Sequence, residues 1–271
     1  MTRAGGHDMK IDANGTAFNC RVDEREGAPW IVFSNSLATD LSLWDGQVAL
    51  LADRYSILRY DTRGHGLTQA SPPPYTFDML TGDALALMDA VGVDKAHWVG
   101  LSLGGSTGIG MALKYGARLR SLAVCDSRSR TDPAFVKAWD DRIATIDAGG
   151  MDAIVEPTIA RWFTPPFIAS GKAVCDRVRD MIRNTSTDGF AGCSRALQTL
   201  DFERRLGELK LPVMFLVGSQ DAACPPEAAK AMHALVAGSH CVIVDPASHI
   251  SNLENPGQFN AALEAHLKRA G

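Results

Sequence analysis

The sequence lacks the features that are typical of membrane proteins, secreted proteins and nucleic-acid-binding proteins. Its 271 residues contain no stretch of about 18 apolar residues, so we expect no membrane-spanning segment. The segment from Met1 to Asp8 has no apolar run either, so we expect no signal peptide. Neither sign of charge dominates, because 27 basic and 31 acidic side chains leave a formal net charge of −4. This balance gives no reason to expect a nucleic-acid partner.

Cysteine pairs and phosphate-binding loops are also missing. No glycine-rich loop is followed by a phosphate-binding lysine, which argues against nucleotide chemistry. The cysteines show neither paired spacing nor the spacing of a metal site, so we expect reduced thiols, a cytoplasmic location and no metal. They are Cys20, Cys125, Cys175, Cys193, Cys224 and Cys241. The sequence also has no internal repeat, and its 46% hydrophobic content is enough for one sizeable core.

Short apolar runs predict the strands of one sheet. Residues 9–22 are typical of a β-hairpin, with Asn14 and Gly15 at the turn. The later runs do not alternate with polar residues, which is typical of strands that are covered on both faces. These runs lie at 30–33, 57–58, 98–99, 122–124, 213–217 and 241–244. Together they predict an eight-stranded, mostly parallel sheet.

Helical patterns separate most of these runs. Residues 78–91 place apolar side chains on one face, and a final helix is expected at about 256–269. Strands that alternate with helices form parallel sheets with right-handed crossovers, which predicts an α/β fold flanked by helices. In such folds the functional site lies at the carboxyl ends of the strands.

One long segment interrupts the alternation. From Pro133 to Glu208 we find helical patterns but no convincing strand. We interpret this segment as a helical cap, inserted between strands 6 and 7, that covers the strand ends and shapes a substrate cavity. A set of ordinary packing helices is the alternative. The predicted division is a core domain of residues 1–130 and 209–271, with a cap of residues 131–208.

A candidate nucleophile follows the run at 98–99. The stretch Trp98 to Gly105 contains Gly-x-Ser-x-Gly, with Ser102 at its centre. A serine on such a strand–turn–helix has a strained backbone, which holds its hydroxyl above the end of the sheet. The following helix directs its free N–H groups toward the position where an oxyanion would form. A small-residue turn without catalytic function is the alternative.

A serine nucleophile requires a base and an acid that orients the base. His249 follows the last apolar run and is the best candidate for the base, with His65 as its rival. Asp221 follows the run at 213–217 and is the best candidate for the acid, although Asp126 occupies a similar place after residues 122–124. The order Ser102, Asp221, His249 is that of a hydrolase triad on an α/β fold.

Two backbone N–H groups are needed to bind the oxyanion. Leu103, which follows the nucleophile, supplies one of them. The second is expected from Leu37, in the loop after residues 30–33. The turn Asp61 to Gly66 is expected to be structural, with Asp61 and Arg63 bracing neighbouring loops.

At these residues the chain resembles the α/β-hydrolase superfamily, and within it the 3-oxoadipate enol-lactonases. The resemblance is carried by Ser34 to Trp44, Asp61 to Gly66, Gly100 to Gly105 and Ala247 to Asn252, together with Arg161 to Pro165 in the cap. It implies hydrolysis of a small lactone or ester during the degradation of aromatic compounds, without a cofactor. It also implies that the triad and oxyanion residues keep the roles given above.

The substrate itself is left open. Arg130, Trp139 and Trp162 are candidates for contacting a substrate carboxylate and its ring, and a solvated charge or cap core is the alternative reading. The stretch Cys125 to Pro133 carries more charge than the enol-lactonases have there. A carboxylesterase, a cofactor-free perhydrolase or a small-molecule receptor on the same fold therefore remain alternatives. We expect no nucleic-acid or membrane partner, and either a monomer or a homodimer.

Overall fold

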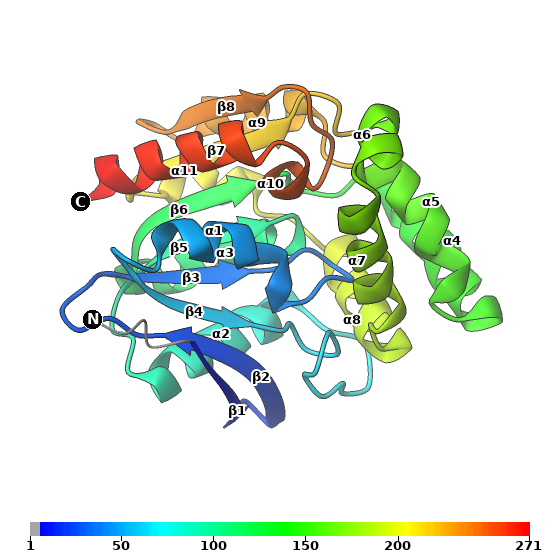
Figure 1. The fold of residues 1–271 in the computed structure, drawn as a ribbon, viewed down its shortest axis with the longest axis horizontal. Coiled ribbons are helices and arrows are strands. Elements are labelled where there is room, and N and C mark those ends of the chain that lie inside the picture. The colour runs from blue at the N-terminus through cyan, green and yellow to red at the C-terminus, as the bar shows by residue number, and fades with distance from the viewer. Residues whose placement is uncertain (1–5) are drawn as a thin grey trace.

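The computed structural model describes residues 6–271, which form one eight-stranded sheet with helices on both faces (Figure 1). Residues 1–5, part of the segment on which the expectation of no signal peptide depends, lie outside the described residues. The strands follow the order β1-β2-β4-β3-β5-β6-β7-β8. They are β1 His7–Ala13, β2 Thr16–Asp23, β3 Trp30–Ser34, β4 Ser56–Tyr60, β5 Ala96–Leu101, β6 Leu119–Cys125, β7 Val213–Gly218 and β8 His240–Val244.

The first two strands form the predicted hairpin. Asn14 and Gly15 both have positive φ angles, of 46° and 72°, which a two-residue hairpin turn requires. β2 pairs antiparallel with β4, whereas the neighbouring strands from β4 to β8 are parallel. The expected mostly parallel, eight-stranded sheet is therefore confirmed.

Helices flank the sheet, and two of them correspond to the helices predicted at 78–91 and 256–269. They are α1 Asp45–Leu51, α2 Phe77–Val91, α3 Leu103–Tyr115, α9 Pro226–Leu235, α10 Ser251–Glu254 and α11 Pro256–Ala270, with 3₁₀ turns η1 Leu41–Trp44, η2 Gly116–Arg118 and η3 Glu203–Glu208. Two flanking residues cap helix α2: the Thr76 side chain accepts a hydrogen bond from the Met79 N–H at its start, and Gly92 follows its end with a left-handed backbone.

The sheet buries both of its faces, and successive residues of a strand enter different cores. Ile31 and Phe33 of β3 pack in one core with α1 and α11, whereas Val32 between them packs in the other core with α2, α3 and α9. Because side chains of a strand alternate between faces, an uninterrupted apolar run is what a doubly covered strand requires. This explains why these strands show no polar alternation in the sequence.

Five helices lie between β6 and β7 and confirm the predicted helical insertion. They are α4 Pro133–Gly149, α5 Asp152–Trp162, α6 Pro165–Ser170, α7 Lys172–Arg183 and α8 Thr187–Gln198. Figure 1 shows these helices at one end of the sheet, facing the carboxyl ends of the parallel strands. We refer to α4–α8 as the cap helices. Among residues 6–271, no helix combines the length and the apolar character needed to cross a membrane.

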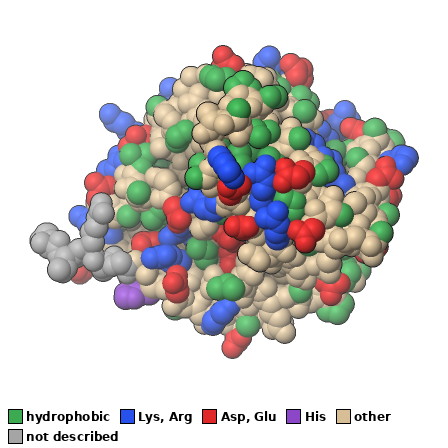
Figure 2. All heavy atoms as spheres, turned by 45° about the vertical axis from the view of Figure 1, so that its right-hand side comes forward, with side chains coloured by type: hydrophobic (Ala, Val, Ile, Leu, Met, Phe, Trp, Pro, Cys, Tyr) green, Lys and Arg blue, Asp and Glu red, His purple; other side chains and the backbone are tan. Residues whose placement is uncertain are grey.

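The outer surface of the cap helices is highly charged. Figure 2 brings these helices forward and shows basic and acidic side chains intermixed on this face. Arg179 of α7 forms an ion pair with Glu156 of α5 at 2.7 Å, and Arg183 of α7 pairs with Asp152 of α5 at 3.0 Å. These pairs join two cap helices, but each exposed pair contributes only about 0–1 kcal/mol to stability.

Candidate active site

Ser102 lies at a sharp turn between β5 and α3. Its backbone angles, φ 55° and ψ −112°, are strained for a residue with a side chain. The Ser102 N–H donates to the carbonyl of Cys125 at the end of β6, and the Ser127 hydroxyl donates to the Ser102 carbonyl. The neighbouring strand and loop therefore hold the turn in its strained form.

The two glycines of the Gly-x-Ser-x-Gly motif are required by close backbone contacts. A Cβ atom on Gly100 would lie 2.1 Å from the carbonyl oxygen of Gly104, and one on Gly104 would lie 2.1 Å from the carbonyl oxygen of Ser34. Real Cβ atoms do not approach oxygen so closely, so neither position tolerates a side chain without backbone movement. The motif thus packs the turn against both α3 and the loop after β3.

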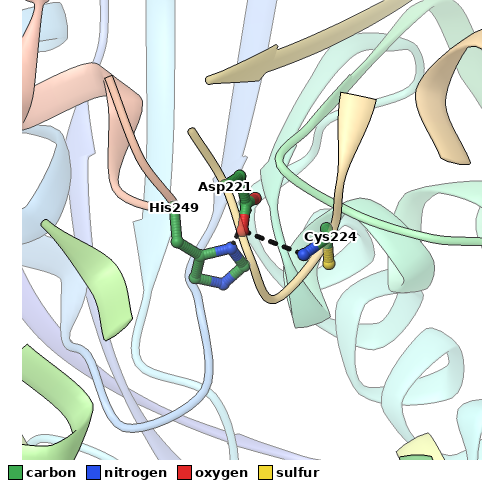
Figure 3. Close-up of side chains that lie close together, drawn as sticks. All are labelled: Asp221, Cys224 and His249. Carbon is green, nitrogen blue, oxygen red and sulfur yellow. Dashed lines mark hydrogen bonds and ion pairs between the residues drawn. The ribbon is translucent and has the colours of Figure 1, made fainter. Parts of the chain in front are cut away.

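His249 and Asp221 lie on the loops after β8 and β7 and form a buried hydrogen-bonded pair. The Nδ1–H of His249 donates to Oδ2 of Asp221 at 2.8 Å, and Oδ1 of Asp221 accepts the N–H groups of Ala223 and Cys224. Figure 3 shows one ring nitrogen of His249 facing Asp221 and the other pointing away from it. The carboxylate thereby fixes the imidazole orientation and leaves Nε2 free to exchange a proton.

Neither rival from the sequence contacts this pair as an acid or base would. Oδ1 and Oδ2 of Asp126 instead accept the Gly218 N–H and the Ser251 hydroxyl, and burial together with the nearby Asp221 raises the pKa of Asp126 well above its usual range. His65 is fully buried, donates from Nδ1 to the Arg63 carbonyl, and has its pKa lowered to about 4 by burial.

Asp221, Cys224 and His249 place one carboxylate oxygen, one sulfur and one imidazole nitrogen within 4.8 Å of one another (Figure 3). Burial raises the pKa of the Cys224 thiol, which disfavours the thiolate form that a metal ion would bind. Both Asp221 oxygens and the His249 Nδ1 are already engaged in hydrogen bonds. The donor set therefore suits a hydrogen-bonded pair better than a metal centre.

A cavity of about 150 Å³ lies between the strand ends and the cap helices. Ser102 and His249 both line it, so residues 147 positions apart in the chain meet at one site. Leu37 lines the same cavity from the loop after β3. Leu103 is the first residue of α3, so its N–H belongs to the helix turn that has no intrahelical partners. Leu103 thus directly follows Ser102, and Leu37 lines the same cavity, so both expected oxyanion residues belong to this site.

Trp139 of α4 and Trp162 of α5 line the cavity as well. The Trp162 ring lies 5.9 Å from the His249 ring, centroid to centroid. Trp139 packs edge-on against Phe135 and Phe190, which also line the cavity. The two tryptophans are therefore both part of the cap core and part of the wall that a ligand would touch.

Arg130 is the one predicted site residue that the structure places elsewhere. It forms an extended bridge with Asp201, its side chain is 63% exposed, and its Nε lies 3.1 Å from a carboxylate oxygen of Glu203. It does not line the cavity. The structure therefore places the Arg130 side chain outside the cavity, next to Glu203, and its contact with a substrate carboxylate stays a prediction that this geometry does not support.

Three other arginines, which the sequence analysis did not single out, line the cavity instead: Arg128, Arg142 and Arg161. The Arg142 guanidinium lies 4.3 Å from the Trp139 ring centroid, and burial followed by the charge of Arg161 lowers its pKa to about 10. Burial also lowers the pKa of Arg161. Helical spacing was the available signal, because Arg142 follows Trp139 by three positions and shares its face of α4.

The turn from Asp61 to Gly66 is structural, as expected. The Asp61 carboxylate accepts N–H groups from Leu41 and Leu67 and a side-chain N–H from Asn19. Arg63 donates two hydrogen bonds to Asp83 on α2. These contacts connect the hairpin, the loop after β3 and α2 beneath the site.

A sequence model described as the α/β hydrolase fold matches residues 29–256. The match covers most of the chain and includes the strained serine and the His–Asp pair, so the chain belongs to the α/β-hydrolase family. It is 32% identical over 259 residues to 3-oxoadipate enol-lactonase 2 of Acinetobacter baylyi, with 96% of each chain covered.

Two solved structures are also similar. The enol-lactonase of Burkholderia xenovorans LB400 superposes with a TM-score of 0.92 and 36% identity, covering 96% of this chain and 100% of its own. A thermophilic esterase of Thermogutta terrifontis, solved with malate bound, has a TM-score of 0.90 and 26% identity, covering 97% of this chain and 99% of its own. These likenesses confirm the family and fold expected from the sequence.

Proposed function

We propose that this protein is a serine hydrolase that opens a lactone or cleaves a carboxylic ester through an acyl-enzyme, and that its substrate is an enol-lactone of the 3-oxoadipate type. One observation carries the proposal: the strained Ser102 shares a single cavity with the buried His249–Asp221 pair. The similarity to two enol-lactonases supports the choice of substrate.

In the proposed reaction, the Ser102 hydroxyl oxygen attacks the lactone carbonyl carbon while Nε2 of His249 takes the hydroxyl proton. The Asp221 carboxylate stabilises the resulting imidazolium, and the N–H groups of Leu37 and Leu103 bind the oxyanion. When the tetrahedral intermediate collapses, the ring C–O bond breaks and His249 returns the proton to the enol oxygen, which stays attached to the acyl group. A water molecule, deprotonated by His249, then attacks the acyl carbon. The bond from this carbon to the Ser102 oxygen breaks, His249 returns the proton to that oxygen, and the free acid leaves.

The charge of the cavity supports an acidic substrate. Arg142 and Arg161 line it, and no aspartate or glutamate of residues 6–271 is among the lining residues. An enol-lactone of 3-oxoadipate keeps one free carboxylate after the other has closed the ring. A carboxylate beside two partly buried guanidinium groups would form charge-assisted hydrogen bonds and relieve their mutual repulsion. We assign to these two arginines the contact that the sequence analysis gave to Arg130.

The proposed nucleophile is tested by Ser102→Ala. This variant should lose hydrolysis of the enol-lactone and of a small neutral ester, and it should no longer react with a fluorophosphonate probe. Ser106→Ala is the matched control, because Ser106 lines the same cavity one helical turn further along α3 and should leave the labelling in place. Unchanged labelling of Ser102→Ala would refute the assignment.

The proposal also covers the domain division, the cellular location and the oligomeric state. We propose that residues 131–208 act as a cap domain over a core of residues 1–130 and 209–271, and that the protein works in the cytoplasm as a monomer or homodimer. All six cysteines are free, five of them buried, which supports a reducing compartment.

A further inference from the structure

The Glu254 carboxylate connects two segments that meet beside the cavity. Its Oε1 accepts the N–H and the hydroxyl of Thr164, at 2.9 and 2.5 Å, and its Oε2 accepts the N–H of Ser248 at 2.8 Å. Thr164 lies between the cap helices α5 and α6, whereas Ser248 immediately precedes His249. One side chain therefore ties the cap to the loop that carries the proposed base.

The cap end of this connection holds substrate-facing residues. Arg161 and Trp162 form the last turn of α5, line the cavity, and are followed by Phe163 and Thr164. Two further hydrogen bonds join the same stretch to the histidine loop: the Ser248 hydroxyl donates to the Arg161 carbonyl, and the Ile250 N–H donates to the Trp162 carbonyl. The residues on both sides of His249 are thus attached to the end of α5.

The Glu254 carboxylate contacts only hydrogen-bond donors of these two segments among the described residues. Within the part of the chain that the structure describes, no lysine, arginine or histidine lies within ion-pair distance of its carboxylate. N–H and O–H donors alone satisfy it, and bonds of this kind to an ionised acceptor are shorter and stronger than neutral ones. The Glu254 N–H also bonds back to the Ile250 carbonyl, which places the carboxylate one helical turn from the loop it fixes.

We propose that Glu254 is a positioning residue, which sets the His249 imidazole and the Arg161–Trp162 end of the cap in register with each other. This inference rests on the proposed function, because it takes His249 as the base. Displacing either end would misplace a reacting or binding group, and small misplacements of this kind reduce rates by about 10- to 100-fold.

The test compares three variants with the wild-type enzyme. Glu254→Gln keeps the size of the side chain but offers one oxygen and one NH₂ group, so it can satisfy only one of the two segments. Thr164→Val removes the hydroxyl, which donates to Glu254 and also accepts the Phe167 N–H at the start of α6, and it leaves the bond from the Thr164 N–H to Glu254 in place. Glu264→Gln is the matched control, because Glu264 only pairs with Arg54 on the exposed side of α11.

Each folded variant is measured in three ways: the rate of fluorophosphonate reaction, kcat for a small neutral ester, and KM for the anionic enol-lactone. Glu254→Gln should lower the first two by about 10-fold or more and raise the third several-fold, with Thr164→Val weaker in the same direction and Glu264→Gln unchanged. A merely structural role would lower the unfolding temperature and leave all three quantities unaltered per folded molecule.

Two failures are distinguishable. If wild-type Ser102 does not react with the probe, the proposed function fails and the question of Glu254 falls with it. If the wild-type protein reacts and turns over the lactone, but Glu254→Gln does so with the same rates and the same KM, the positioning role is refuted while the proposed function stands.

Discussion

Replacing Arg142 with glutamine should weaken the use of an anionic substrate and at the same time stabilise the folded protein. The Arg142 guanidinium sits over the Trp139 ring in the cavity and is held near a second cation, Arg161. Its pKa is lowered to about 10, so it stays charged at neutral pH in spite of the cost of its burial. A charged group kept in such a place is expected where it serves a ligand.

The loss of activity follows from the strength of one charge-assisted contact. A hydrogen bond to a charged group contributes about 1.5–3 kcal/mol, which corresponds to a loss of about 10- to 150-fold in kcat/KM for the enol-lactone. A small neutral ester makes no such contact, so its kcat/KM should change less than about 2-fold. The ratio of the two effects isolates the charge from any general damage to the site.

The gain in stability follows from the same environment. Lowering the pKa from 12.5 to about 10 would cost about 3 kcal/mol in a dry site, and about 1–2 kcal/mol once partial exposure is allowed for. Glutamine removes this cost and also loses a cation–π contact worth about 0.5–1 kcal/mol. The free energy of unfolding should therefore rise by about 0–1.5 kcal/mol.

The assay pairs kcat/KM for both substrates with urea unfolding, and Arg130→Gln serves as the control. Arg130 has the same chemistry but lies outside the cavity, paired with Glu203, so its replacement should leave both rate constants unchanged. Equal losses on the neutral and the anionic substrate, or an activity loss caused by Arg130→Gln instead, would refute the reasoning.

Two further predictions complement the experiments on Ser102 and Glu254. Asp221→Asn should keep the fold but lower kcat by about 10³- to 10⁴-fold, because an amide would stabilise the wrong imidazole tautomer; a loss below 10-fold would point to Asp126 as the acid. His266 is fully buried, and burial, with His240, His97 and Arg269 nearby, lowers its pKa to about 3. Between about pH 6.5 and 3 the unfolded chain therefore binds a proton at His266 that the folded chain does not bind, so the free energy of unfolding falls as pH drops below about 6.5. The variant His266→Leu should shift the midpoint of acid unfolding, followed by circular dichroism, to lower pH by roughly half a unit. An unchanged or higher midpoint would contradict this cause.

The sequence determined the fold because its signals are local. Uninterrupted apolar runs such as residues 213–217 identify strands that are covered on both faces, and the Asn14-Gly15 turn identifies the hairpin. Strand ends in a parallel sheet share one edge, so a serine, an aspartate and a histidine that each follow a strand were expected to meet. The structure brings these three residues to one place at that edge.

Side-chain direction in the segment between β6 and α4 was decided only by the tertiary structure. Arg130 and Arg128 are two positions apart, yet one points to Glu203 and solvent while the other lines the cavity. No periodicity governs an irregular segment between a strand and a helix, so its sequence does not indicate which side chain faces inward. The link from Glu254 to Thr164 spans 90 positions and depends on how the junction between α5 and α6 meets α10, which no local pattern records. The sequence by itself determined the sheet, the turn and the order of Ser102, Asp221 and His249, whereas packing between distant segments decided which arginines line the cavity and which residues contact the His249 loop.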